Sequence, residues 1–114
     1  MDIALQIARK GDTFGNRGPL VSAQRYRNEK IVAEKMDSDD DLTVWVVPVR
    51  GRRVVVDGHH ALTAALRLGK MPRIATCVER CLAEGEDEGE WLADQARRGG
   101  DDWHCPITGE PMTI

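Results

Sequence analysis

The sequence predicts an α+β fold, a small mixed sheet with packed helices, and two observations carry this prediction. The first is a set of runs rich in β-branched residues, typical of strands, at residues 43–49, 53–57 and 73–78. The second is a helical spacing of apolar residues near residues 3–10, 23–36, 59–68 and 90–98. From residue 23 onward the order is helix, strand, strand, helix, strand, helix, which the 114 residues of one domain can accommodate.

The N-terminal part is expected to form a short helix at residues 3–10, followed by a glycine-rich loop. Ser22 suits the N-cap of a second helix, which we expect from about residue 23 to residue 36. The acidic run at residues 37–41 should end it, because acidic side chains oppose the dipole at a helix C-terminus. The expected inner face of this helix consists of Tyr26, Val32, Ala33 and Met36.

A β-hairpin is predicted next, with strands at residues 43–49 and 53–57 joined by a turn at residues 50–52. Pro48 has no amide to donate, so we expect it at a sheet edge or a strand terminus. The three arginines of the hairpin, Arg50, Arg52 and Arg53, are interpreted as surface charges.

The remaining elements follow from glycine and proline positions. A helix at residues 59–68 should stop at Gly69, which suits the left-handed position after a helix, and a third strand should occupy residues 73–78. A last helix at residues 90–98 would use Trp91, Leu92 and Ala96 as contacts. The tail that follows is expected to pack back on the body through Trp103, Ile107 and Met112.

Charge separates an acidic C-terminal segment at residues 79–114 from the rest of the chain, in which an N-terminal helix and loop at residues 1–21 precede a core at residues 22–78. Residues 1–78 carry 13 basic and 9 acidic side chains, whereas residues 79–114 carry 3 and 10. The net charge of −3 argues against strong DNA binding. The acidic segment is either a solvated surface packed on the core or an arm that contacts a protein partner.

Nothing in the sequence indicates a membrane or a secreted protein. No apolar run approaches the roughly 20 residues of a membrane span, and the N-terminus lacks a signal-peptide core. We therefore expect a cytoplasmic protein whose three cysteines are reduced. A zinc site is a weaker hypothesis, because adjacent residues such as His104 and Cys105 fit poorly as two ligands of one tetrahedral site with Cys77 and Cys81.

The strongest functional signal is the stretch VVVDGHHALTAALRLG at residues 54–69, where a strand breaks at Asp57 and Gly58 and turns into a helix. Glycine lets the backbone approach a ligand, and the first amides of a helix favour an anion. His60 is a better candidate than His59, because two adjacent residues at a helix start do not both face one ligand. The alternative is a structural turn whose histidines only cap the helix.

Side chains around this turn could complete a site. Asp57 would bind Mg²⁺, accept a proton from a substrate hydroxyl, or cap the helix that follows. Arg73 follows the motif helix and is expected to lie near the site. The full set of basic candidates for neutralising phosphate consists of Arg25, Arg27, Arg50, Arg52, Arg53, Lys70 and Arg73.

Gly58-His59-His60, together with the small and apolar residues that follow it, resembles the signature of the ParB/sulfiredoxin superfamily. The similarity covers about residues 22–78 and is greatest to ParB-like domains with an Asp-Gly-His-His turn. It implies a ParB/sulfiredoxin-like fold and a nucleotide such as ATP or CTP bound with Mg²⁺. One departure is Ala61, which occupies the position of a phosphate-contacting arginine in the family.

The resemblance also implies residue roles. Asp57, His60 and Glu34 would be catalytic, and Asp57 would hold the metal. The nucleotide would be bound by Gly58, His59, His60, Ala61, Thr63 and Arg73. Sulfiredoxin-like reduction is not expected, because position 59 is histidine and not cysteine.

Three functions stay open at this level. The first is binding of a nucleotide or phosphate compound, with NTP hydrolysis or kinase-like phosphoryl transfer as the enzymatic form. The second is an inactive phage- or plasmid-type interaction module, an adaptor or inhibitor, that uses its acidic segment. The third is a ParB-like nuclease, for which no metal ligand beyond Asp57 is evident.

Overall fold

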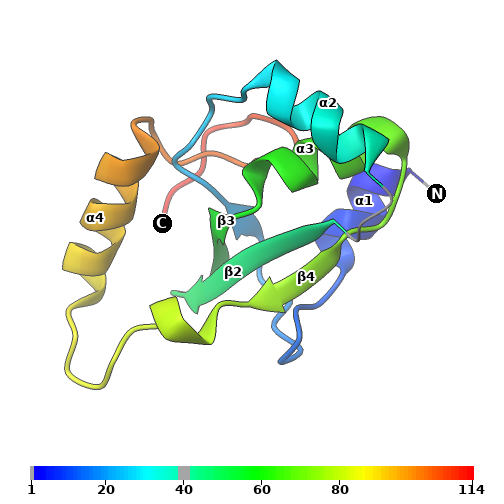
Figure 1. Cartoon of the computed structure of the whole chain (residues 1–114). Helices are drawn as coiled ribbons and strands as arrows, with labels where there is room; N and C mark the ends of the chain where they lie inside the picture. Colours follow the sequence, from blue (N-terminus) through cyan, green and yellow to red (C-terminus); the bar gives the residue numbers. More distant parts are fainter. Residues whose placement is uncertain (1, 39–41) are drawn as a thin grey trace.

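The computed structural model describes residues 2–38 and 42–114, which form a four-stranded sheet and four α-helices (Figure 1). The expected α+β class with a small mixed sheet is therefore confirmed. The elements in chain order are α1 (Ile3–Arg9), β1 (Leu20–Val21), α2 (Glu29–Asp37), β2 (Thr43–Val49), β3 (Arg52–Asp57), α3 (His59–Leu68), β4 (Arg73–Thr76), the 3₁₀ turn η1 (Val78–Arg80) and α4 (Glu88–Gly99).

The sheet has the strand order β1-β3-β2-β4. The hairpin strands β2 and β3 are antiparallel, whereas β1 and β4 run parallel to their neighbours β3 and β2. The α3 helix connects β3 to β4 and so crosses over β2. Strand β4 pairs with β2 only from Thr43 to Val46, so Pro48 of β2 lies beyond the end of β4. The missing amide of Pro48 therefore removes no hydrogen bond to β4.

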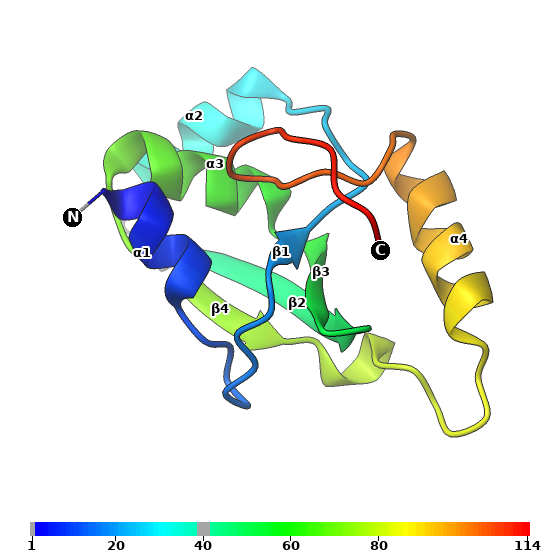
Figure 2. The same ribbon diagram turned by 180° about the vertical axis from the view of Figure 1, so that it is seen from behind.

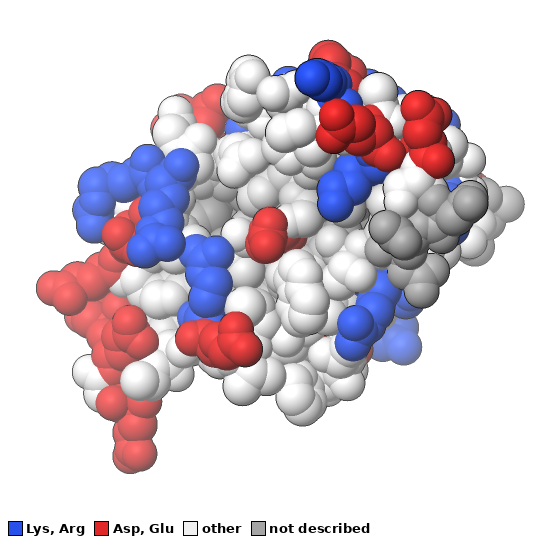
Figure 3. Space-filling view, viewed as in Figure 1, with Lys and Arg blue, Asp and Glu red and all other residues white. Residues whose placement is uncertain are grey.

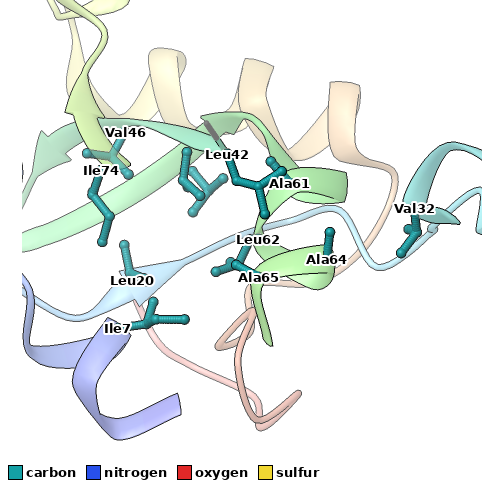
Figure 4. Packing of buried hydrophobic residues seen from close by; sticks show 12 residues of the cluster. Ile7, Leu20, Val32, Leu42, Val46, Ala61, Leu62, Ala64, Ala65 and Ile74 are labelled. Atoms are coloured by element: carbon teal, nitrogen blue, oxygen red, sulfur yellow. The ribbon is translucent and has the colours of Figure 1, made fainter. Parts of the chain in front are cut away.

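Two apolar layers hold the sheet between helices. On one face, the small residues of α3 let the helix approach the sheet closely, and Ala61, Leu62, Ala64 and Ala65 meet Ile7 of α1 and Val32 of α2 there (Figure 4). On the other face, Trp91 and Leu92 of α4 pack against the valines of β2 and β3. The view from behind shows α4 and the C-terminal segment beside this sheet (Figure 2).

The second helix is shorter than the sequence predicts, and the expectation of a helix from residue 23 was wrong. Residues 23–28 are irregular because side chains occupy their backbone groups: Arg27 Nη1 donates to the carbonyls of Gln24 and Tyr26. The helix begins only after Asn28, whose Oδ1 accepts from the amides of Lys30 and Ile31.

The inner face of α2 was only half predicted. Val32 is fully buried and Met36 packs on the core, but Ala33 is exposed and Tyr26 is 71% exposed. The helix ends at Asp37, and residues 39–41 of the acidic run lie outside the described residues.

Strand β1 and the role of Ser22 were not predicted. Leu20 and Val21 pair with Arg53 and Val54 of β3, and the amide of Ser22 donates to the carbonyl of His104 at 2.9 Å. Ser22 therefore links the strand to the C-terminal tail and does not cap a helix.

Arg53 is fully buried, which corrects its interpretation as a surface charge. Its guanidinium donates to three backbone carbonyls: Gly18 at 2.7 Å, Lys10 at 2.7 Å and Ala8 at 3.3 Å. Two of these carbonyls lie at the C-terminal end of α1, where carbonyls lack helical partners. Burial lowers the pKa of Arg53, an effect that the nearby Asp12 carboxylate opposes.

The C-terminal segment packs on the body as predicted. Trp103 and Met112 contact the α4 layer, and Ile107 contacts the core on the other face. Acidic side chains gather over the loop before α4 and its first turn, and basic side chains gather over its other end (Figure 3). The longest described helix has 12 residues, and none of the described helices has the length and apolarity needed to cross a membrane.

Candidate functional site

The corner between β3 and α3 contains a β-bulge that redirects Asp57. Trp45 is paired with Asp57 and Val46 with Val55, so Val56 is an extra residue without a partner opposite. Paired residues share a face of the sheet, and Val46 faces the core. The bulge therefore turns Asp57 away from the core, onto the face of Trp45, where the carboxylate is exposed.

Gly58 is required at this corner for two reasons. Its φ of 86° is in the left-handed region, and a Cβ on it would lie 2.3 Å from the carbonyl oxygen of Thr43. The corner thus packs directly on the first residue of β2. Asp57 Oδ1 accepts from the Gly58 amide at 2.7 Å, and no described side chain caps the first turn of α3.

Replacing Gly58 with alanine is expected to destabilise the protein by roughly 2–3 kcal/mol, because backbone strain and the clash with Thr43 add together. Gly69→Ala is the matched control, because Gly69 also has positive φ but a Cβ on it would meet no other described part of the chain within 4 Å. Urea unfolding should give a loss of about 1 kcal/mol for Gly69→Ala. Equal losses in the two variants would contradict the close approach at Thr43.

The two histidines of the turn face different neighbours. His59 is buried, and its Nε2 lies 2.7 Å from Ser22 Oγ. Burial lowers the pKa of His59 to about 4, with Arg27 adding to the shift and Asp57 opposing it. His60 Nε2 accepts from the Asn28 amide at 3.1 Å, so this nitrogen holds the start of α2. Neither geometry was visible in the sequence, because both partners come from the irregular segment after β1.

Asp57 lines two pockets. The first, of about 200 Å³, is lined by Gly58 and Ala61 of the α3 first turn and by Lys35 of α2. The second, of about 390 Å³, is lined by Cys77, Glu79 and Arg80 among others. Trp45 and Asp57 line both pockets. Of the residues that begin α3, Gly58 and Ala61 line the smaller pocket, whereas His59 and His60 line neither pocket.

Sequence reasoning missed Trp45 and Lys35, which line these pockets, and it also missed Arg80. Its Nη1 donates to the carbonyl of Val56, the bulged residue, at 2.9 Å, and its Nη2 donates to Gln95 Oε1 at 2.6 Å. The strand expected at residues 73–78 ends at Thr76, and η1 then turns Arg80 back toward β3. The only signal in the sequence was a basic residue shortly after a short strand, which is too common to be informative.

The other predicted site residues lie around the corner without joining it. Thr63 Oγ1 accepts from Arg27 and donates to the His59 carbonyl, which makes it part of the scaffold. The Arg73 guanidinium lies 5.9 Å from the centre of the Trp45 ring, a cation–π contact beside the pockets. Glu34 is exposed on α2 and lines neither pocket.

Within residues 2–38 and 42–114, no three His, Cys, Asp or Glu side chains are grouped so that they could share a metal ion. Cys77, Cys81 and Cys105 are free thiols, and burial raises the pKa of Cys81. A bound phosphate compound would supply further oxygen ligands to a divalent cation at Asp57. Mg²⁺ commonly binds in this way, through one or two carboxylates and substrate phosphates.

No protein-family model, curated protein or solved structure matches this chain significantly.

Proposed function

We propose that the protein binds a nucleotide or a related phosphate compound at the corner between β3 and α3. The observation that carries this proposal is that Gly58 and Ala61, at the start of α3, line a pocket of about 200 Å³. The amides at the start of a helix lack intrahelical acceptors, and the helix dipole favours an anion beside them. Lys35 adds a positive charge to the same pocket.

The two neighbouring pockets suit the two parts of a nucleotide. Phosphates would be held at Gly58 to Ala61, and the base would contact Trp45, which reaches both pockets. Asp57 lines both pockets and is the residue that would hold Mg²⁺ together with the phosphates. Bound Mg²⁺ would neutralise part of the negative charge of the phosphates. Arg80 contributes a guanidinium on the side of the larger pocket.

The ParB/sulfiredoxin-like fold belongs to the same proposal. It is supported by the order of hairpin, glycine turn, α3 and parallel β4 around residues 43–76. NTP hydrolysis or phosphoryl transfer is the enzymatic extension. It receives less support than binding, because His60 Nε2 already accepts from Asn28 and Glu34 lines neither pocket.

A thermal-shift comparison of ATP, CTP and pyrophosphate, each with and without Mg²⁺, tests the proposal. A ligand at a hundred times its Kd should stabilise the protein by roughly 2.7 kcal/mol and raise Tm by several degrees. Asp57→Asn is expected to remove the Mg²⁺-dependent part of the shift. Trp45→Ala is expected to weaken ATP and CTP but to spare pyrophosphate, which has no base.

Asp102→Asn is the control, since Asp102 is an exposed carboxylate that lines none of the pockets described above. A melting temperature that no nucleotide moves would refute binding at the corner. A shift that survives both Asp57→Asn and Trp45→Ala would assign the ligand to another part of the molecule.

An interaction module is the second candidate, and one observation favours it. Five exposed acidic residues precede or begin α4, namely Glu84, Glu86, Asp87, Glu88 and Glu90. Of these five residues, only Glu88 forms a salt bridge within the described part of the chain, with Arg50 at 3.6 Å. This acidic surface would suit a basic protein partner. It becomes the leading proposal if the nucleotide screen is negative.

A further inference from the structure

A third pocket lies between α4 and the sheet, and it shares Arg80 with the larger pocket beside Asp57. Its volume is about 100 Å³, and it is lined by residues of β3, of the segment after β1 and of the last turns of α4. A Cβ on Gly99 would lie 2.4 Å from the Ala23 carbonyl oxygen, so α4 packs directly on that segment. The polar lining includes Arg80, Arg98, Gln95, Gln24 and His59.

The lining, as far as the described residues form it, carries two guanidinium groups and no carboxylate. Arg80 is half-buried, and its guanidinium donates to neutral groups, the Val56 carbonyl and the Gln95 amide oxygen. Arg98 does have a counter-ion, Asp94 at 3.0 Å, but the same carboxylate also contacts Arg97 at 3.6 Å. The pocket therefore has an excess of positive charge, which a small anion would balance.

Arg80 is held in place before any ligand arrives, whereas the Arg98 side chain is 66% exposed. Two bonds fix the Arg80 guanidinium, and the Trp91 indole donates to the Arg80 carbonyl at 3.1 Å, which also fixes its backbone. Gln95 Oε1 accepts from Arg80, so the NH₂ group of the same amide is left to donate to a ligand. Since the pKa of His59 is lowered to about 4, its ring is neutral at pH 7 and brings no third charge into the lining.

We propose that the pocket formed by Arg80, Arg98 and Gln95 binds a small tetrahedral oxyanion, phosphate or sulfate. Two guanidinium groups and an amide provide the directed donors that such an anion accepts. The volume admits an ion of this kind but not a nucleotide. Arg80 lines both this pocket and the larger pocket beside Asp57, whereas Arg98 and Gln95 line only this one, so the response of Arg98 distinguishes this site from the corner.

The test is a titration of the wild-type protein with inorganic phosphate, followed by the NMR signals of the arginine Nε–H groups. Ionic strength is kept constant with sodium chloride. Saturable shifts are expected at Arg80 and Arg98, and sulfate in a second arm should compete for the same site. Arg98→Gln should weaken phosphate binding about tenfold.

Arg97→Gln provides a matched control, because Arg97 is also exposed on α4 and also contacts Asp94, but it does not line the pocket. Its phosphate affinity should stay within about twofold of wild type. Bound phosphate should also raise the pKa of His59, visible as a shifted titration of its ring signals. Linear shifts without saturation, or equal affinities for the two variants, would overturn the proposal.

Discussion

Arg53→Ala is expected to lower the free energy of unfolding by roughly 3–5 kcal/mol. The substitution removes a fully buried side chain whose guanidinium donates to the carbonyls of Gly18, Lys10 and Ala8. Buried carbonyls without donors are costly, and the vacated volume adds a cavity term. A domain of this size has a total stability of about 5–15 kcal/mol, so the variant should unfold at a clearly lower urea concentration than wild type.

Arg52→Ala separates this effect from the loss of a charge. Arg52 is the neighbouring residue in β3, and its Nη1 donates to the carbonyl of Arg50 in the exposed turn. Its loss should cost less than about 1 kcal/mol. Urea denaturation monitored by tryptophan fluorescence would give both values. A loss for Arg53→Ala as small as that for Arg52→Ala would show that the three carbonyls find other donors.

Arg53 also illustrates why part of the fold was predictable and part was not. The hairpin, α3 and the end of α3 at Gly69 follow from periodicity and glycine positions, and the structure confirms them. These signals are local. The burial of Arg53 depends on carbonyls 35 to 45 residues away in the sequence, and no local pattern reports them.

Two other errors have the same origin. Residues 23–28 have helix-compatible side chains, but Arg27 and His60 occupy the backbone groups that a helix would need. Strand β1 has two residues in a glycine- and proline-rich stretch, and it exists because β3 offers a free edge. In both places tertiary partners decide the local structure.

The candidate site was predictable to a similar extent. A strand that turns at once into a helix predicts a glycine at the turn, and the left-handed conformation of Gly58 agrees with that prediction. The direction of Asp57 depends on a bulge at Val56, and the bulge in turn is held by Arg80, 24 residues away. Sequence alone therefore located the corner but did not predict on which face of the sheet the Asp57 side chain lies.

Lowering the pH from 6.5 to 4 is expected to cost about 3 kcal/mol of stability through His59 alone. Its pKa in the folded protein is about 4, against an ordinary value of 6.5, because burial disfavours the charged imidazolium. In this interval the unfolded chain binds a proton at His59 and the folded chain does not. The contribution is therefore complete above pH 6.5 and is lost as the pH falls toward 4.

His59→Gln is the variant that isolates this titration, since glutamine retains a polar group that can bond to Ser22 Oγ but does not ionise. Asp12 does not interfere in this interval. Burial alone would raise the pKa of Asp12, but hydrogen bonds from Asn16 and Phe14 lower it, so Asp12 acts below pH 3.8. The free energy of unfolding of His59→Gln, measured in urea at pH 6.5, 5.5 and 4.5, should fall much less steeply than that of wild type. Parallel curves for the two proteins would mean that water or a shift of the Ser22 segment solvates the protonated ring, and that the corner is less rigid than its hydrogen bonds indicate.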